Sequence, residues 1–284
     1  MAEAGRLESV LAAGGFAVTA EITPPLSADP EELLKRADPL KGLADAVNVT
    51  DGASARIAMS PLAAAAILAR HGIEPVVQFT CRDRNRLALQ ADLLGAAALG
   101  VRNYLMLGGD DPKVGDQPET KPVFDLDSRS LIATAQQMQA EGKLPSGREI
   151  VGRPRFFLGC ADTPVDPAPG WQPKSLAAKV EAGARFVQTQ FCFDVGIARR
   201  YAARLIEAGL DKRAAVLIGI GPLASARGAR WMRENLFGTI IPDSLIARLE
   251  GAEDQATEGL KICLDLMREL SAVPGIAGVH LMAP

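Results

Sequence analysis

The chain has 284 residues, a formal net charge of −3, and aromatic residues at only 5% of its length. The low charge and the scarcity of aromatic side chains argue against a nucleic-acid-binding surface, which needs basic patches and stacking platforms. A hydrophobic share of 48% and a charged share of 23% indicate neither disorder nor a membrane protein. We expect one globular domain over residues 1–284 that acts on a small molecule.

Short runs of aliphatic and β-branched residues alternate with longer Ala- and Leu-rich stretches along the whole chain. This alternation is typical of parallel strands joined by crossover helices. The expected strands cover residues 16–22, 45–50, 75–80, 103–108, 155–160, 185–191, 214–219 and 277–282. The expected helices cover residues 29–38, 60–71, 86–99, 128–141, 173–182, 195–208, 224–234 and 254–271. Eight such units in a chain of this length predict an α/β fold, the (β/α)8 TIM barrel.

Two connections are longer than the usual short loop, residues 110–128 after the fourth strand and residues 145–154 before the fifth. The first follows the carboxyl end of a strand and therefore belongs to the face that carries active sites in such barrels. The second belongs to the opposite face, and we expect it to be inert.

The cellular setting is predicted from features near the amino terminus and from the cysteines. The first residues, MAEAGRLESV, lack the uninterrupted apolar stretch of a signal peptide, and no apolar run approaches the length of a bilayer span. Four cysteines lie far apart without a CxxC pair, and the sequence has only two histidines. We expect reduced thiols in a cytoplasmic protein and no metal site.

Polar residues stand at the carboxyl ends of successive expected strands, at Glu21, Thr50 and Thr80, with Asp110 just beyond the fourth. These ends meet in one mouth of a (β/α)8 barrel, so Glu21 and Asp110 are expected to share a pocket. Desolvation raises the pKa of a carboxyl group and makes it a usable general acid near neutral pH. A salt bridge or a helix cap is the alternative explanation for Glu21.

The loops after the strands carry further candidates, each with a purely structural alternative. Gly108 and Gly109 let the backbone approach a ligand closely, although glycine beside aspartate is also a common turn. The arginines of residues 82–84 could bind an anion at a helix start or form surface ion pairs. Asp127 or Ser128 is expected to cap the following helix.

Two side chains near the sixth expected strand also suit a ligand. Gln190 closes the run RFVQTQ, and its carboxamide can donate and accept at once, which suits the edge of an amide-like heteroaromatic ring. Lys179 lies on the preceding helix, where a solvated lysine and a phosphate or ribose contact are equally good explanations. No Ser-His-Asp set, P-loop or GxGxxG after a strand is present.

Eight segments together resemble the methylenetetrahydrofolate reductase family along essentially the whole chain: AEITPP, VNVTDGA, QFTCRDRN, LMLGGDDPKVGD, VFDLDS, KVEAGARFVQTQFCFD, IGIGPLAS and GVHLMAP. The resemblance implies a barrel that binds FAD at the strand ends and reduces methylenetetrahydrofolate to methyltetrahydrofolate with NAD(P)H, or runs in reverse. It implies that Glu21 is the acid that opens the folate ring, that Asp110 acts between flavin and pterin, and that Gln190 contacts the pterin.

The same resemblance implies a set of flavin contacts, which are Thr50, Thr80, Leu107, Gly108, Gly109, Asp110, Asp127 and Lys179. The sequence departs from the family pattern at Gln78, where many members have histidine, and at Gly108, where many have arginine.

Two other functions remain open beside ping-pong hydride transfer through FAD. A flavin-free reductase would pass hydride directly from NAD(P)H to the folate, with Glu21 still acting as the acid. A folate-binding partner subunit would bind folate without reducing it alone. The expected partners are therefore tetrahydrofolate derivatives and NAD(P)H, without nucleic acid or membrane, and a homo-oligomer is left open.

Overall fold

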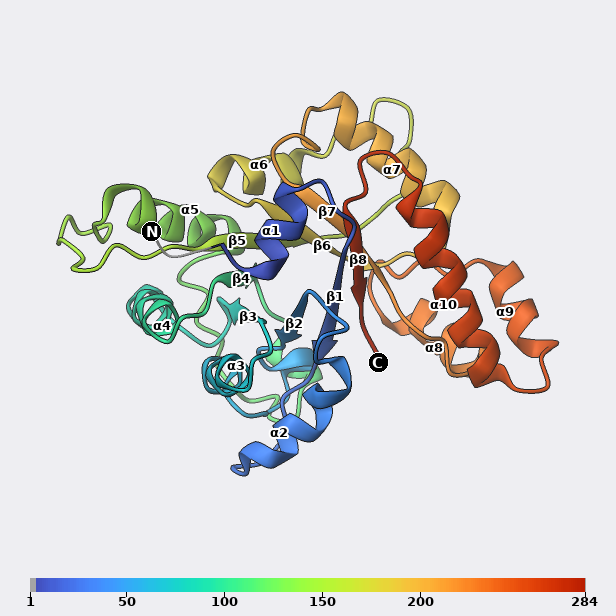
Figure 1. Ribbon diagram of the computed structural model, residues 1–284, viewed down its shortest axis with the longest axis horizontal. Coiled ribbons are helices and arrows are strands. Elements are labelled where there is room, and N and C mark those ends of the chain that lie inside the picture. The colour runs from blue at the N-terminus through green and yellow to red at the C-terminus, as the bar shows by residue number, and fades with distance from the viewer. Residues whose placement is uncertain (1–3, 284) are drawn as a thin grey trace.

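Eight parallel strands close into a barrel in the computed structural model, which describes residues 4–283 (Figure 1). Each strand pairs in parallel with the next, and β1 pairs with β8 to complete the ring. The strands are β1 (Ala17–Ile22), β2 (Ala46–Val49), β3 (Pro75–Thr80), β4 (Asn103–Leu107), β5 (Phe157–Asp162), β6 (Phe186–Phe191), β7 (Ala215–Ile220) and β8 (Gly278–Leu281). The predicted (β/α)8 barrel is confirmed, and every strand boundary lies within about two residues of its expected position.

Eight helices surround the barrel at the predicted places. They are α2 (Pro30–Ala37), α3 (Pro61–Arg70), α4 (Arg86–Ala98), α5 (Ser128–Glu141), α6 (Lys174–Ala182), α7 (Val195–Glu207), α8 (Ala226–Asn235) and α10 (Gln255–Ser271). Side-chain caps fix several of the starts: Asp29 accepts from the backbone N–H of Glu31, and Asn85 accepts from those of Leu87 and Ala88. The helices and the outward strand residues bury one continuous apolar layer.

Two further helices were not predicted. Helix α9 (Asp243–Glu250) lies at the periphery against α8 and α10, within the connection from β7 to β8 (Figure 1). Helix α1 (Arg6–Ala12) precedes the first strand, and its Leu7 is fully buried. Leu7 packs against the inward side chains at the amino ends of the strands, which are Ala17, Ala46, Val76, Leu105, Phe186 and Leu217. Helix α1 therefore closes the base of the barrel.

The side chains inside the barrel change from apolar to polar along the strand direction. Every second residue of a strand faces the same side, and in β1 the apolar base residue Ala17 is followed by Thr19 and then Glu21. In β6 the corresponding series is Phe186, Gln188 and Gln190. The barrel thus has an apolar base and a polar mouth.

The loops follow the expected division between the two faces. Residues 142–155, between α5 and β5, fold back through an antiparallel bridge of Lys143 with Glu149 on the amino-end face. The loop after β4 contains the short 3-10 helix η3 (Pro112–Val114), and the loop after β2 contains η2 (Ala53–Ala55), while η1 (Asp38–Leu40) follows α2. No helix within residues 4–283 is both long and apolar enough to cross a membrane.

Candidate functional site

A cavity of about 630 Å³ opens at the carboxyl ends of the strands. Glu21 and Asp110 both line it, as the order of the strands predicts. The other sequence-predicted residues in its wall are Thr50, Thr80, Leu107, Gly108, Gly109, Lys179 and Gln190. The residues at the strand ends, which are far apart in sequence, therefore lie around one cavity, as predicted.

Asp127 is the one expected flavin contact that does not line this cavity. Its side chain accepts a 2.7 Å hydrogen bond from the backbone N–H of Ser130, and the Ser130 hydroxyl accepts one of 2.9 Å from the Asp127 N–H. This capping box fixes the start of α5, and its hydrogen bonds lower the pKa of Asp127. The capping alternative is confirmed for this residue.

Glu21 ends the inward series of β1, and one of its oxygens is already surrounded by donors. Gln78 Nε2 donates to Glu21 Oε2 over 2.7 Å, and His280 Nε2 lies 3.5 Å from the same oxygen. The side chain is 23% exposed, toward the cavity that it lines. Within residues 4–283, Glu21 pairs with no lysine or arginine and caps no helix. Its carboxyl group is therefore positioned and still accessible, as a proton donor must be.

A chain of fully hydrogen-bonded polar side chains lies beneath Glu21. His280 Nδ1 is 2.9 Å from Thr19 Oγ1, which accepts from Gln188 Nε2 over 3.0 Å. Gln188 and Asn48 exchange two hydrogen bonds, of 2.6 and 3.0 Å. All four residues are at most 2% exposed. Buried polar groups persist only when they are paired, so this chain specifies one arrangement of the barrel interior.

This inner row was not predicted, although the sequence carries a signal for it. Counting back two residues from the predicted Glu21, Thr50 and Gln190 gives Thr19, Asn48 and Gln188. Successive inward residues of a strand are two positions apart. A polar residue at the mouth therefore predicts that the residue two positions earlier also faces the barrel interior.

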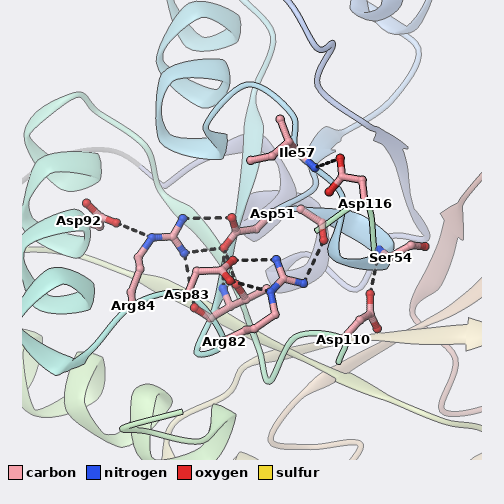
Figure 2. Close-up of polar contacts among 11 residues, drawn as sticks. Asp51, Ser54, Ile57, Arg82, Asp83, Arg84, Asp92, Asp110 and Asp116 are labelled. Carbon is pink, nitrogen blue, oxygen red and sulfur yellow. Dashed lines mark hydrogen bonds and ion pairs between the residues drawn. The ribbon is translucent and has the colours of Figure 1, made fainter. Parts of the chain in front are cut away.

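Asp110 holds the loop after β2 against the loop after β4. Its Oδ2 accepts a 2.8 Å hydrogen bond from the backbone N–H of Ser54, and Asp116 Oδ2 accepts one of 3.1 Å from Ile57 N–H (Figure 2). Ser54 and Ala55 both have φ of 54°, a left-handed conformation that costs energy for residues other than glycine. The contacts with the loop after β4 help to offset that cost.

The arginines after β3 form ion pairs, one of the two expected alternatives, but the arginine side chains are more buried than in surface pairs. Asp51 is 6% exposed and accepts from Thr80 N–H over 2.7 Å and from Arg84 Nη1 over 2.6 Å, and Arg84 Nε also lies 3.0 Å from Asp92 (Figure 2). Arg82, 4% exposed, pairs with Asp83 at 2.7 Å. The pairs are buried because the loops after β2 and β4 cover them, which local sequence does not indicate.

The opposite wall of the cavity is built by β5, β6 and α6. Lys179 Nζ donates to the backbone oxygen of Ala161 over 2.7 Å, which holds the ammonium group at the cavity wall and leaves its other hydrogens for a ligand or water. Asp162, which the sequence analysis also missed, accepts from the hydroxyl of Tyr201, and burial raises the pKa of this carboxyl group. Gln190 Oε1 accepts from Phe191 N–H, which leaves the amide N–H groups of Gln190 available to a ligand.

The cavity wall carries more acidic than basic side chains. Four carboxylate side chains line it, from Glu21, Asp51, Asp110 and Asp162, against the two cations Arg82 and Lys179. The hydroxyl of Thr50 is buried and has no hydrogen-bond partner among residues 4–283. A Cβ added to Gly108 would meet no atom within 4 Å, so the backbone there faces open space. The cavity thus offers an unsatisfied hydroxyl, an open stretch of backbone and an accessible carboxyl group.

Comparisons with known proteins agree with one another. The family model described as "Methylenetetrahydrofolate reductase" matches residues 6–283. The chain is 26% identical over 274 residues to 5,10-methylenetetrahydrofolate reductase of Salmonella typhimurium, covering 94% of this chain and 86% of that protein. It is 26% identical over 234 residues to a probable methylenetetrahydrofolate reductase (NADPH) of Caenorhabditis elegans, covering 80% of this chain and 32% of that protein.

A solved structure with the same fold comes from Clostridium thermocellum. It is 15% identical, with a TM-score of 0.67, and the match covers 97% of this chain and 91% of that one. It is described as an uncharacterized protein that binds two copies of 5-methyl-5,6,7,8-tetrahydrofolic acid.

Proposed function

The chain belongs to the methylenetetrahydrofolate reductase family, an oxidoreductase family, and on that premise we propose that it reduces methylenetetrahydrofolate in the mouth cavity with Glu21 as the general acid. The observation that carries the proposal is the position of the Glu21 carboxyl group, oriented by Gln78 and accessible from a cavity of about 630 Å³. The folate ligand of the Clostridium thermocellum protein gives independent support for the substrate class.

The acid step follows from the chemistry of the substrate. Protonation of a ring nitrogen breaks its bond to the methylene carbon and leaves an iminium on the folate. Hydride addition to that carbon then gives the methyl group, so one turnover consumes a hydride from NAD(P)H and a proton from Glu21. Asp110 and Gln190 would hold the pterin, because a carboxylate and a free amide match its alternating donors and acceptors.

We include FAD in the proposal because the cavity has features that suit a flavin ring. The unpaired hydroxyl of Thr50 and the open backbone at Gly108 are what such a ring needs nearby. The residues that would hold the group are Thr50, Thr80, Leu107, Gly108, Gly109, Asp110 and Lys179. When bound, a flavin accepts hydride from NAD(P)H and returns it to the folate, which makes ping-pong transfer the expected kinetic scheme.

Direct hydride transfer without flavin is the second candidate, and one observation favours it. Of the two cations in the wall, Arg82 is already paired with Asp83, and Lys179, which donates to the neutral Ala161 carbonyl oxygen, is in no ion pair among residues 4–283. A flavin dinucleotide brings a pyrophosphate that needs positive charge, whereas four carboxylates line this wall.

The visible absorption spectrum of the freshly purified protein separates the two candidates. A flavin spectrum together with folate-dependent NAD(P)H oxidation supports the first, and undiminished activity in a colourless protein supports the second. If neither the flavin-containing nor the flavin-free protein oxidises NAD(P)H in a folate-dependent way, the proposed reaction is refuted.

Replacing Glu21 tests the acid directly. Glu21→Gln should lower folate reduction about 10²- to 10⁴-fold, the usual contribution of a general acid, and leave any reduction of bound flavin by NAD(P)H largely intact. Glu253→Gln, at an exposed glutamate before α10, is the matched control. Equal loss of both half-reactions would remove Glu21 from the assigned role.

A further inference from the structure

We propose that Thr19 and His280 form a fixed pair that presents an Nε2–H group to Glu21, so that the proton which Glu21 delivers sits on Oε1. The proposal rests on the proposed function, since it concerns how the acid is held. His280 and Thr19 would be positioning residues, because they act on the substrate only through the carboxyl group of Glu21.

The first step concerns the single hydrogen of the Thr19 hydroxyl. Thr19 Oγ1 accepts from Gln188 Nε2 over 3.0 Å, so its own hydrogen must point elsewhere. Two acceptors are within reach, His280 Nδ1 at 2.9 Å and the backbone oxygen of Val279 at 3.4 Å. We assign the hydrogen to the shorter contact, which makes Nδ1 an acceptor; in the alternative assignment the hydroxyl donates to Val279 O and the imidazole Nδ1–H donates to the second lone pair of Thr19 Oγ1. A neutral imidazole whose Nδ1 accepts carries its proton on Nε2.

The orientation of the two inner amides decides which group of Gln188 faces Thr19. Gln188 uses one amide hydrogen for Thr19 and the other for Asn48 Oδ1, while its oxygen accepts from Asn48 Nδ2. Reversing the Gln188 carboxamide would set its oxygen against the Asn48 oxygen unless Asn48 reversed as well. With both amides in the observed orientation, Gln188 donates to Thr19, and the Thr19 hydroxyl hydrogen is left for His280 Nδ1 or the Val279 oxygen.

The second step concerns the two oxygens of Glu21. With its proton on Nε2, His280 turns an N–H dipole toward Glu21 Oε2 from 3.5 Å, which is longer than a normal hydrogen bond. Gln78 Nε2 donates to the same oxygen over 2.7 Å, so both neighbours favour negative charge on Oε2 and oppose a proton there. Glu21 Oε1 has no partner among residues 4–283, so the acidic proton belongs on Oε1, the oxygen left free for a substrate.

The tautomer is measurable without any enzyme assay. The sequence has only two histidines, so ¹⁵N-histidine labelling of the full chain gives two imidazole spin systems, and His71→Gln assigns them. We expect His280 to show a protonated Nε2 and an unprotonated Nδ1 at neutral pH. A protonated Nδ1, or a doubly protonated ring, would overturn the proposal. Because the spectrum needs no turnover, it decides this point even if the protein reduces no folate.

Two pairs of variants test the consequence for Glu21 if the wild type is active. His280→Gln can place an amide N–H near the position of Nε2, whereas His280→Asn reaches only as far as Nδ1. We expect a loss of about ten- to hundredfold in folate reduction for His280→Asn and a substantial recovery in His280→Gln, as for loss and return of a hydrogen bond to a charged group. Equal loss in both variants would contradict a donor role.

Thr19→Val and Thr19→Ser give the second pair. Valine has nearly the shape of threonine but no hydroxyl, so Thr19→Val should no longer hold His280 in the Nε2–H form in the ¹⁵N spectrum and should lower the rate of folate reduction. Thr19→Ser should keep both the Nε2–H form and the rate. An unchanged tautomer in Thr19→Val would show that Thr19 does not set it. An inactive wild type with a Nε2–H imidazole would count against the proposed function and not against the tautomer.

Discussion

Removing the negative charge of Asp51 should destabilise the protein more than any single surface ion pair does. Its carboxylate accepts from Thr80 N–H, from the Thr80 hydroxyl and twice from the Arg84 guanidinium, at 2.6 to 3.0 Å. Asp51→Asn keeps the volume but turns an amide donor toward groups that are themselves donors. Breaking a buried ion pair by removing one partner costs about 3–5 kcal/mol.

We expect the lower end of that range for Asp51→Asn. Arg84 keeps a second partner, because Asp92 lies 3.0 Å from its Nε, and its side chain is 18% exposed. A loss of about 3 kcal/mol corresponds to a fall of about 6–12 °C in the unfolding midpoint. Urea titration followed by circular dichroism measures the free energy of unfolding, and a thermal melt measures the midpoint.

Asp166→Asn is the matched control for this prediction. Asp166 also pairs with an arginine, Arg200, at 2.7 Å, but the two side chains are 55% and 54% exposed. Exposed pairs contribute little to stability, so the control should melt close to the wild type. If Asp51→Asn melts no lower than Asp166→Asn, the buried network does not stabilise the loops as we argue.

Three further predictions concern the same cavity. Asp110→Asn should weaken folate turnover about ten- to hundredfold and alter the behaviour of any bound flavin, because the amide can still hold the loop after β2 but lacks the charge; an unchanged rate of folate reduction removes Asp110 from the site. Gly109→Ala should destabilise the fold by about 1–3 kcal/mol, since φ is 99° and the new Cβ would lie 2.8 Å from Arg82 Cβ, whereas Gly108→Ala should alter ligand affinity and leave the melting midpoint in place. Burial raises the pKa of Asp162 above its ordinary value of 3.8, so the folded protein loses stability as pH rises from the pKa of the unfolded state to that of the folded state. The stability of Asp162→Asn relative to the wild type should therefore increase between pH 3 and pH 7. A difference in urea midpoints that does not change with pH would contradict the argument.

The barrel and the residues of its mouth were predictable because both follow from patterns among neighbouring residues in the sequence. A strand buried on both faces is a short apolar run, and Glu21 or Gln190 is conspicuous where such a run stops. The family resemblance drawn from eight short segments is confirmed by the match over residues 6–283. These signals need only neighbours along the chain.

The inner row was harder to predict because its members bond across the barrel. Gln188 and Asn48 are 140 residues apart, and each is one polar residue inside an apolar run, which the strand pattern tolerates without explanation. The burial of Arg82 had the same origin, since it depends on loops from two other strands. Helix α1 was missed because its Leu7 is the one fully buried residue in a short helix, too little for a periodic pattern.

Helix α1 covers the base of a barrel whose interior is already filled by side chains. With Leu7 packed on the apolar residues at the base, the strand-end mouth is where ligands reach Glu21. Folate and dinucleotide would therefore reach Glu21 from the same end of the barrel. Transfer through flavin predicts that they bind in turn, so a folate analogue should compete with NAD(P)H for the free protein, whereas direct transfer requires both ligands in the cavity together.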